Sequence, residues 1–512
     1  MIEIKNFKPR LYQESILNTA KDKNTLIVLP TGLGKTKTSI LIAIKRLNDF
    51  AESKVLFLTS TKPLADQISK EFRESTNLDK NGIILLTGMI NPVKRQELWK
   101  DAVIIVSTPQ GCFNDVVDKK INLNDVSLLI IDEAHRAIGA YDYVNIVKLY
   151  LEQAKNPRII GLTASPGSNY QKVLEICKNL NIEDIEARTH SDDDVKPYIQ
   201  EVKIDMIKVS LPDEFKLVKA CLEKSLINKV ESLKKWGLVG SNQKKVSKKQ
   251  LLDTQKRIQG ELKSGVRDVR LWQGASLISE ALKLQYSIEM LESQGAFAAN
   301  KYMGNIFESA DTTKIKSIKS LVKDANFKEA YVKLNKLIEN NLEHPKLLKL
   351  KEIIKEELLN YNAKIIVFSQ YRDSASTIEK LLNNIGIKSK LFVGQAKKNG
   401  IGLTQKEQIN ILDEFKQGLF NVLVATNIAE EGLDIISVDL VIFYEAVPSA
   451  IRRIQRKGRT ARQTSGKVIM LVTEKTTDEA YHWISHRKEK QMNNIIKNLK
   501  EKLKTTKQKT LL

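Results

Sequence analysis

The stretch Leu26-Ile27-Val28-Leu29-Pro30-Thr31-Gly32-Leu33-Gly34-Lys35-Thr36 decides the fold of this chain. Its apolar start predicts a buried strand, and residues 37–47 continue with the spacing of an amphipathic helix. Glycines between a strand and a helix let the backbone fold around a phosphate, which the N–H groups at the helix start attract. Lys35 would then reach the β- and γ-phosphates of a nucleotide, and the Thr36 hydroxyl would bind Mg²⁺. The other expected nucleotide contacts in this loop are Thr31, Gly32 and Gly34.

A second acidic motif lies about 100 residues downstream. The apolar run 128–131 ends at Asp132-Glu133-Ala134-His135. Carboxylates at the carboxyl end of a buried strand lie where α/β sheets bind their ligands. Asp132 suits the metal, and Glu133 is placed to take a proton from the attacking water. Ordinary solvation of a strand end is the alternative reading, which the presence of Gly34-Lys35-Thr36 makes the minor one.

Short apolar runs separated by helical patterns divide the chain into two α/β regions. Such runs predict strands that are buried on both faces of a parallel sheet. From about residue 211 to residue 341 the pattern is helical, and strand–helix alternation returns after His344-Pro345. We therefore expect an α/β domain over 1–202, an all-α insert over 203–343, a second α/β domain over 344–486 and a basic tail over 487–512. The expected strands lie at residues 26–29, 55–58, 103–106, 128–131, 159–162, 365–368, 422–425, 440–443 and 468–471.

Composition points toward a polyanionic partner. The 512 residues carry a net charge of +22, which attracts polyanions over a long range. A generally lysine-rich proteome would explain the same charge without nucleic acid. The three cysteines are too few and too scattered for a disulfide framework or a zinc site. No apolar stretch reaches the roughly 18 residues of a membrane span, and no signal peptide is evident, so we expect a cytoplasmic protein without membrane contact.

Taken together, the phosphate loop, the Asp132-Glu133-Ala134-His135 box and the later motifs resemble superfamily 2 helicases of the DEAH type. Several blocks are similar to the archaeal Hef family, which is related to the Fanconi anaemia group M translocases. The resemblance implies two RecA-like domains, ATP and Mg²⁺ as cofactors, and ATP hydrolysis stimulated by nucleic acid. It also implies repair factors as protein partners.

The resemblance assigns further nucleotide contacts. Arg10 and Gln13 match the adenine-reading segment, where a glutamine amide offers both a donor and an acceptor. Gly432 and Asp434 match the nucleotide side of motif V. In the segment 455–462, Arg459 and Arg462 are spaced three apart, so on a helix they would project together as arginine fingers at the γ-phosphate. A solvated basic helix is the alternative for that segment.

The resemblance also assigns contacts to the tracked strand. Short hydroxyl side chains and backbone N–H groups suit phosphate contact without reading the base sequence. Thr163-Ala164-Ser165 matches the motif that links the ATP site to the nucleic-acid cleft in this family. The matching nucleic-acid contacts are Thr59, Lys62, Pro63, Thr87, Gly88, Ser107, Thr108, Gln370, Arg372 and Thr426.

The insert decides which kind of helicase this is. Residues 224–270 hold 13 Lys or Arg and 4 Asp or Glu. If helical, Lys244, Lys245, Lys248 and Lys249 would form one basic face for nucleic acid. Trp236 and Trp272 could stack on bases at a duplex junction, although a place in the core of the insert is the favoured interpretation. By resemblance to Hef, the insert is thumb-like and engages forked or branched DNA.

The tail has apolar residues at helical spacing, namely Met492, Ile495, Ile496, Leu499 and Leu503, so part of it should pack against the body. Since no second carboxylate cluster is visible, we expect no nuclease activity from this sequence.

The main hypothesis is a DNA helicase or translocase for forked or branched DNA in replication-fork repair. The first alternative is a double-stranded-RNA-dependent ATPase of the Dicer and RIG-I type, and the second is a scaffold that uses ATP only as a clamp.

Overall fold

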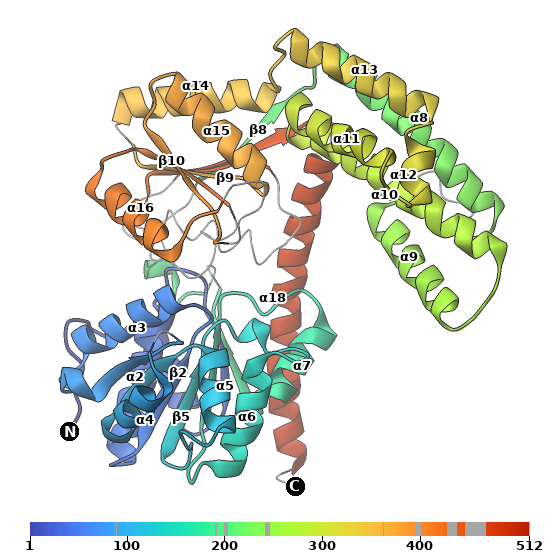
Figure 1. Cartoon of the computed structure of the whole chain (residues 1–512). Coiled ribbons are helices and arrows are strands. Elements are labelled where there is room, and N and C mark those ends of the chain that lie inside the picture. The colour runs from blue at the N-terminus through green and yellow to red at the C-terminus, as the bar shows by residue number, and fades with distance from the viewer. Residues whose placement is uncertain are drawn as a thin grey trace.

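A computed structural model of the chain describes residues 1–88, 90–189, 192–198, 203–240, 246–361, 363–395, 402–426, 438–445 and 467–510. Arg459, Arg462, Gly432, Asp434, Lys244 and Lys245 lie outside these described residues. Two α/β domains are stacked one above the other, and a bundle of long helices projects from the upper one (Figure 1). The expected class, α/β with an all-α insert between two parallel-sheet domains, is confirmed.

The first domain is a seven-stranded parallel sheet in the order β3-β4-β2-β5-β6-β1-β7, with helices on both faces. Apolar clusters fill the space between the sheet and the helices on each side. Its elements are α1 (Leu11–Ala20), β1 (Thr25–Val28), α2 (Lys35–Asp49), β2 (Lys54–Leu58), α3 (Lys62–Ser75), β3 (Ile83–Leu86), α4 (Pro92–Asp101), β4 (Ile104–Ser107), α5 (Pro109–Val117), β5 (Val126–Ile131), α6 (Asp142–Gln153), β6 (Ile159–Thr163), α7 (Tyr170–Asn179) and β7 (Asp184–Ala187).

The second domain is a six-stranded parallel sheet in the order β10-β11-β9-β12-β13-β8. Its central strands β9, β11 and β12 are buried at every position, which is why they read as continuous apolar runs. Its elements are β8 (Lys203–Val209), α14 (Pro345–Tyr361), β9 (Ile365–Phe368), α15 (Arg372–Asn384), β10 (Ser389–Phe392), α16 (Gln405–Gln417), β11 (Val422–Ala425), β12 (Leu440–Phe443) and β13 (Lys467–Thr473).

One strand of the second sheet comes from a distant part of the sequence. β8 pairs in parallel with β13, from Lys203 opposite Lys467 to Val209 opposite Thr473. The sequence reading placed residues 203–209 at the start of the helical insert, whereas the structure places them in the second sheet. The helices of the insert begin only at Asp213.

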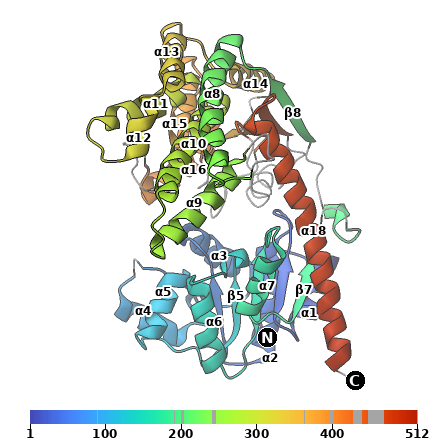
Figure 2. The ribbon, with the colours of Figure 1, turned by 90° about the vertical axis from the view of Figure 1, so that its right-hand side faces the viewer.

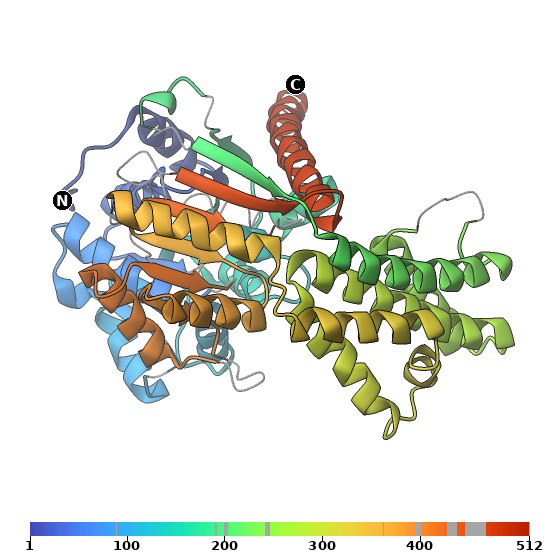
Figure 3. The same cartoon turned by 90° about the horizontal axis from the view of Figure 1, so that it is seen from above.

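Within the described residues the insert is a bundle of six helices. It extends to one side of the motor domains (Figures 1 and 3). Its core is apolar and includes Phe215, Leu284 and Phe327. The helices are α8 (Asp213–Lys235), α9 (Lys248–Lys263), α10 (Val269–Ser293), α11 (Ala296–Ala310), α12 (Lys316–Leu321) and α13 (Ala325–Glu339).

The chain ends in one long helix, α18 (Thr477–Thr510), which follows β13 and runs down the side of the first domain (Figure 2). Met492 and Ile496 are buried in the apolar cluster of the first domain, and Ile495 packs at its margin. The expectation that part of the tail packs against the body is confirmed. The helix begins within the second domain at Thr477, so residues from Arg487 onward continue an element that the second domain starts.

Candidate active site and nucleic-acid interface

The phosphate loop turns from β1 into α2 through a left-handed residue. Gly34 has φ +70° and precedes Lys35, the first residue of α2. A Cβ on Gly34 would lie 3.1 Å from Nε2 of Gln13, so a side chain here would meet both backbone strain and a close neighbour. The N–H groups at the start of α2 are thereby presented at the carboxyl edge of the sheet, where a phosphate can bind.

Residues in the first turn of α1 hold this loop in place. The Tyr12 hydroxyl donates to the Leu33 carbonyl at 2.7 Å, and Nε2 of Gln13 donates to the Gly34 carbonyl at 3.4 Å. Oε1 of Gln13 accepts from the backbone N–H of Arg10 at 3.0 Å. Gln13 was expected to read adenine, but in this structure it is buried and both ends of its amide are bonded to protein. In this structure its amide joins the start of α1 to the phosphate loop, and its contact with adenine stays a prediction.

The two carboxylates follow β5 and are buried. Thr59 donates from Oγ1 to Oδ2 of Asp132 at 3.1 Å, and the Tyr143 hydroxyl donates to the Asp132 carbonyl at 2.8 Å. Burial and the neighbouring charge of Glu133 raise the pKa of Asp132 to about 6, against the opposing attraction of Lys35. Thr59 was expected to contact nucleic acid, yet it is fully buried and bonded to the acidic motif.

Glu133 occupies a strained position beside His135. Its φ of +51° is left-handed, a conformation that costs a non-glycine residue about 1–3 kcal/mol. Oε2 lies 3.2 Å from Nδ1 of His135. Burial disfavours the charge of Glu133, but His135, Lys35 and Arg136 outweigh that effect and lower its pKa. At neutral pH the side chain is therefore a carboxylate that can accept a proton.

A chain of contacts leads from the acidic motif to α18. Nδ1 of His135 lies 3.2 Å from Oγ1 of Thr163, which also accepts from the backbone N–H of Ser165 at 3.1 Å. The Ser165 hydroxyl in turn donates to Sδ of Met492 at 2.8 Å. The structure thus brings the acidic motif, the Thr163-Ala164-Ser165 motif and the C-terminal helix into contact.

The remaining expected contacts in the first domain also lie at the carboxyl ends of strands. Lys62 and Pro63 open α3 after β2, and Thr87 and Gly88 follow β3. Ser107 ends β4, and Thr108 follows it as the N-cap of α5. Gly88 is exposed, whereas Thr87 is buried and Ser107 donates its hydroxyl to the Leu86 carbonyl at 2.9 Å.

The second domain repeats this arrangement. Gln370 and Arg372 follow β9 and are half-buried, and Thr426 follows β11 and is buried. The backbone N–H of Thr426 donates to the Phe392 carbonyl at 3.0 Å, which joins the ends of β11 and β10.

Comparisons with known proteins agree with this layout. The family model "DEAD/DEAH box helicase" matches residues 10–173, "Helicase conserved C-terminal domain" matches 345–464, and a helical-bundle model of ATP-dependent RNA helicases matches 214–344. The solved helicase domain of Hef from Pyrococcus furiosus is 46% identical with a TM-score of 0.71, and the similarity covers 93% of this chain and 98% of that one. This chain belongs to the Hef helicase family.

Two curated relatives illustrate the breadth of the similarity. MJ1505 of Methanocaldococcus jannaschii, provisionally named an ATP-dependent RNA helicase, is 41% identical over 98% of this chain and 62% of its own length. The ATP-dependent DNA helicase mph1 of Neurospora crassa is 34% identical over 92% of this chain and 42% of its own length. The chain therefore spans less than two thirds of these curated relatives.

In the insert of this Hef-family helicase, α9 begins at Lys248 with Ser247 as its N-cap. Lys248 and Lys249 therefore lie on this helix, whereas Lys244 and Lys245 lie outside the described residues, so the basic face of all four stays a prediction. Lys248 forms an ion pair with Glu289 and lies 5.6 Å from the centre of the Tyr286 ring, whereas Lys249 is exposed.

Trp272 was expected in the core but is 64% exposed; it lies in the first turn of α10, which begins at Val269. Trp236 is half-buried.

A buried polar joint fixes the insert to the second domain, and composition gave no signal for it. At the end of α10, Nε2 of Gln294 donates to Oε1 of Glu445 at 2.7 Å. Glu445 also accepts from the Ser369 hydroxyl at 2.8 Å and from the backbone N–H of Gln370 at 3.0 Å. The insert is thereby bonded to the loop after β9, which carries the expected strand contacts.

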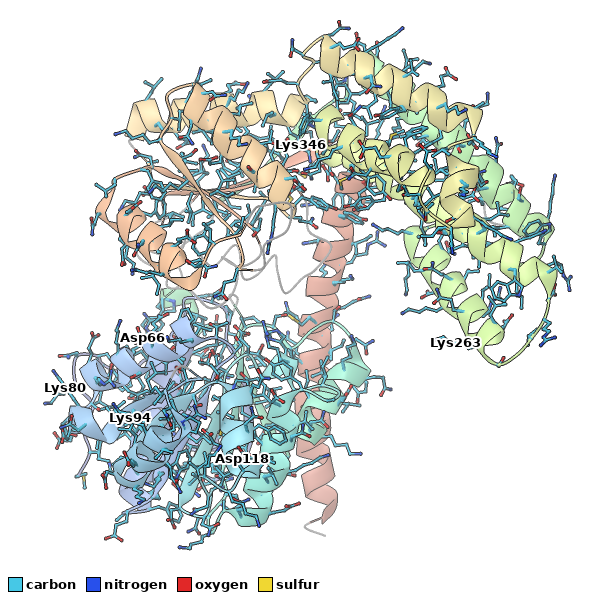
Figure 4. All side chains as sticks on the ribbon, viewed as in Figure 1. Asp66, Lys80, Lys94, Asp118, Lys263 and Lys346 are labelled. Carbon is cyan, nitrogen blue, oxygen red and sulfur yellow. The ribbon has the colours of Figure 1, made fainter. Side chains whose placement is uncertain are left out.

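A second buried set reinforces the joint. Lys346 is fully buried, forms an ion pair with Asp478 at the start of α18, and donates to the Tyr444 carbonyl at 3.1 Å. Figure 4 labels it where α14 meets the insert. Glu292 accepts from the Thr477 backbone N–H at 2.9 Å.

Among the residues that the structure describes, none of the helices combines the length and apolarity that a membrane span requires.

Proposed function

We propose that this chain is the ATP-driven motor of a helicase or translocase that acts on forked or branched DNA. The observation that carries the proposal is the meeting of Lys35, Asp132 and Glu133 at one edge of the first sheet, with a contact path from Glu133 to Ser165. Family membership supports the reaction class, and the basic insert supports a nucleic-acid partner.

Mg²⁺ suits this site on chemical grounds. Asp132 and Glu133 are neighbouring buried carboxylates, and a divalent cation would offset both the burial and the repulsion by Glu133 that raise the pKa of Asp132. Thr36 and Asp132 would hold the ion. When bound with ATP, it would offset charge on the phosphates and fix their orientation.

Glu133 is the proposed general base. Its depressed pKa keeps it ionised, so it can take a proton from the water that attacks the γ-phosphate. The left-handed backbone at Glu133 turns the chain sharply after β5 and fixes where the carboxylate stands. Lys35 would stabilise the phosphate charge that grows during the transfer.

The second domain would complete the site on closure. Arg459 and Arg462 remain the predicted arginine fingers, and Gly432 and Asp434 the predicted nucleotide contacts. ATP would favour closure, and phosphate release would reverse it, so that alternating grip moves the enzyme along a strand.

Double-stranded RNA is the second candidate substrate. MJ1505 carries an RNA-helicase name, whereas mph1 carries a DNA-helicase name, so the relatives' names point in both directions. The name of the mph1 relative favours DNA for this chain. Repair factors stay the predicted protein partners.

The decisive experiment compares ATP turnover with forked DNA, linear duplex DNA and double-stranded RNA at one salt concentration. Equal salt matters because phosphate contacts make all such binding salt-dependent. Strongest stimulation by the fork is the expected result. Strongest stimulation by double-stranded RNA would replace the substrate while keeping the motor, and absence of turnover with all three would refute the motor itself.

A further inference from the structure

The outer end of the insert is a helical hairpin formed by α9 and α10. The turn between them, residues 264–268, includes Gly265 with φ +90°, and the Asp268 side chain caps α10 by accepting from the Arg270 N–H at 2.8 Å. Figures 1 and 2 show α9 at the lower edge of the insert, where it descends toward the level of the first motor domain, and Figure 4 labels Lys263 at the lower end of this helix. The glycine and the helix cap therefore give the outer end of the insert an ordered turn.

Large apolar side chains are exposed at this turn. Val266 is 47% exposed, Val269 is 69% exposed and Trp272 is 64% exposed. Val269 and Trp272 are three residues apart on α10, so they share one face of the helix. The opposite face carries Leu271 and Ile278, which pack into the α9–α10 core, so Trp272 points away from it. Within the described part of the chain, Trp272 forms no ring contact.

Positive charge surrounds this apolar face. Residues 246–272 contain seven Lys or Arg and three Asp or Glu. Lys263 and Arg267 are exposed beside the turn, and Arg270 is paired with Asp268. A flat aromatic ring among cations is complementary to a nucleic-acid strand, whose bases stack on rings and whose phosphates attract cations.

The hairpin is held in fixed relation to the second motor domain. α10 runs from Val269 at the outer end to Ser293, next to Gln294 and its bond with Glu445. Movement of the second domain is therefore transmitted along one continuous helix to Trp272. Bases inside a duplex already stack on each other, so only unpaired bases at a junction or in a single-stranded arm offer a free face.

We propose that Trp272 and Val269 form a stacking surface for unpaired bases at the junction of a forked nucleic acid, with Lys263 and Arg267 on the adjoining phosphates. The proposal rests on the proposed function and names the part of the fork that the insert touches.

The test measures the dissociation constants of the full chain for a labelled fork and for a blunt duplex of equal length, by fluorescence anisotropy. W272A should weaken fork binding about tenfold, since removing a stacked ring costs about 5- to 150-fold in affinity, and should weaken duplex binding much less. W272F keeps a ring and should bind the fork within about threefold of the unmodified chain. W483A removes a 51% exposed tryptophan on α18 and is the matched control.

Tryptophan emission gives a second readout. The fork should quench the emission of the unmodified chain, and W272F should lose that quenching while still binding the fork. A variant that fails to fold would instead lose binding to both the fork and the duplex.

Unchanged fork binding by W272A would overturn the stacking surface, and would leave a protein partner as the occupant to seek. Equal losses in W272A and W483A would overturn it as well. Failure of the unmodified chain to respond to any nucleic acid in the ATPase assay would refute the proposed function, so the two failures are distinguishable.

Discussion

Glu133 is the residue whose substitution most directly tests the chemistry. Glu133→Gln keeps the size of the side chain but removes its ability to accept a proton, so ATP should still bind while turnover falls about 10²- to 10⁴-fold. The measurement is steady-state ATP hydrolysis with saturating fork, together with the dissociation constant of ATP. Asp118→Asn, an exposed change in the same domain, is the control. Turnover undiminished in E133Q would refute Glu133 as the base.

His344 makes the joint sensitive to acid. Its Nε2–H donates to the Glu292 carbonyl at 3.0 Å, and Nδ1 accepts from the Lys346 N–H at 3.2 Å, so the ring is neutral. Burial, aided by the charge of Lys346, lowers the pKa of His344 to about 3. The unfolded chain takes up this proton near pH 6.5 and the folded chain does not, so stability is lost as pH falls below 6.5.

The expected change in stability with pH follows from the uptake of one proton per molecule on unfolding. Between pH 7 and pH 5 the free energy of unfolding should fall by about 2 kcal/mol because of His344 alone. We expect H344N to be less stable at pH 7, with a deficit that shrinks by that amount by pH 5, as measured by urea unfolding. Above pH 7 the deficit should stay constant, and parallel curves from pH 7 down to pH 4 would contradict the assignment.

At the scale of elements, the strands that the sequence did not reveal are the four edge strands, β3, β7, β8 and β10. A central strand is covered on both faces and paired on both sides, so it is almost purely apolar. An edge strand tolerates polar residues, as Asp184 and Glu186 in β7 show, and β10 has two half-covered positions. β3 is apolar but only four residues long. Periodicity therefore predicted the centres of both sheets and missed their margins.

The candidate site also contains residues whose place could be predicted from the sequence and residues whose contacts could not. Lys35, Asp132 and Glu133 were predictable because each follows an apolar strand with a recognisable local pattern. The hydrogen bonds of Gln13 and Thr59 were not predictable, because their partners Gly34 and Asp132 lie 21 and 73 residues away in sequence. The Gln294–Glu445 bond spans 151 residues and has no local signal.

That bond should couple the insert to the motor. Gln294→Ala removes the donor to Glu445 while Ser369 and Gln370 still bind the carboxylate. Changes along such a path alter coupling by about 0.5–2 kcal/mol, so fork unwinding per ATP hydrolysed should fall about 2- to 30-fold. The measurement compares unwinding and ATP turnover on one fork. Gln285→Ala, also on α10, is the control, and equal losses in both variants would remove the special role of Gln294.

At the scale of the whole molecule, α18 ties the two motor domains together. It starts beside Lys346 in the second domain and buries Met492 and Ile496 in the first. Its contact with Ser165 places the end of this connection at the motif next to the acidic residues. The docked helix limits how far the two motor domains can separate. It therefore limits the opening movement of a motor that works by domain closure.

Ile496→Asp should release that restraint. A carboxylate cannot stay in the apolar cluster without a partner, so the far half of α18 should leave the first domain. The radius of gyration of the nucleotide-free protein, measured by small-angle X-ray scattering, should rise. Because closed molecules become rarer, the ATP concentration needed for half-maximal turnover should rise as well. Asn498→Asp adds the same charge at an exposed position two residues on and should change neither quantity. An unchanged radius of gyration in I496D would mean that other contacts hold the two motor domains together. The docking of α18 on the first domain would then not limit their separation.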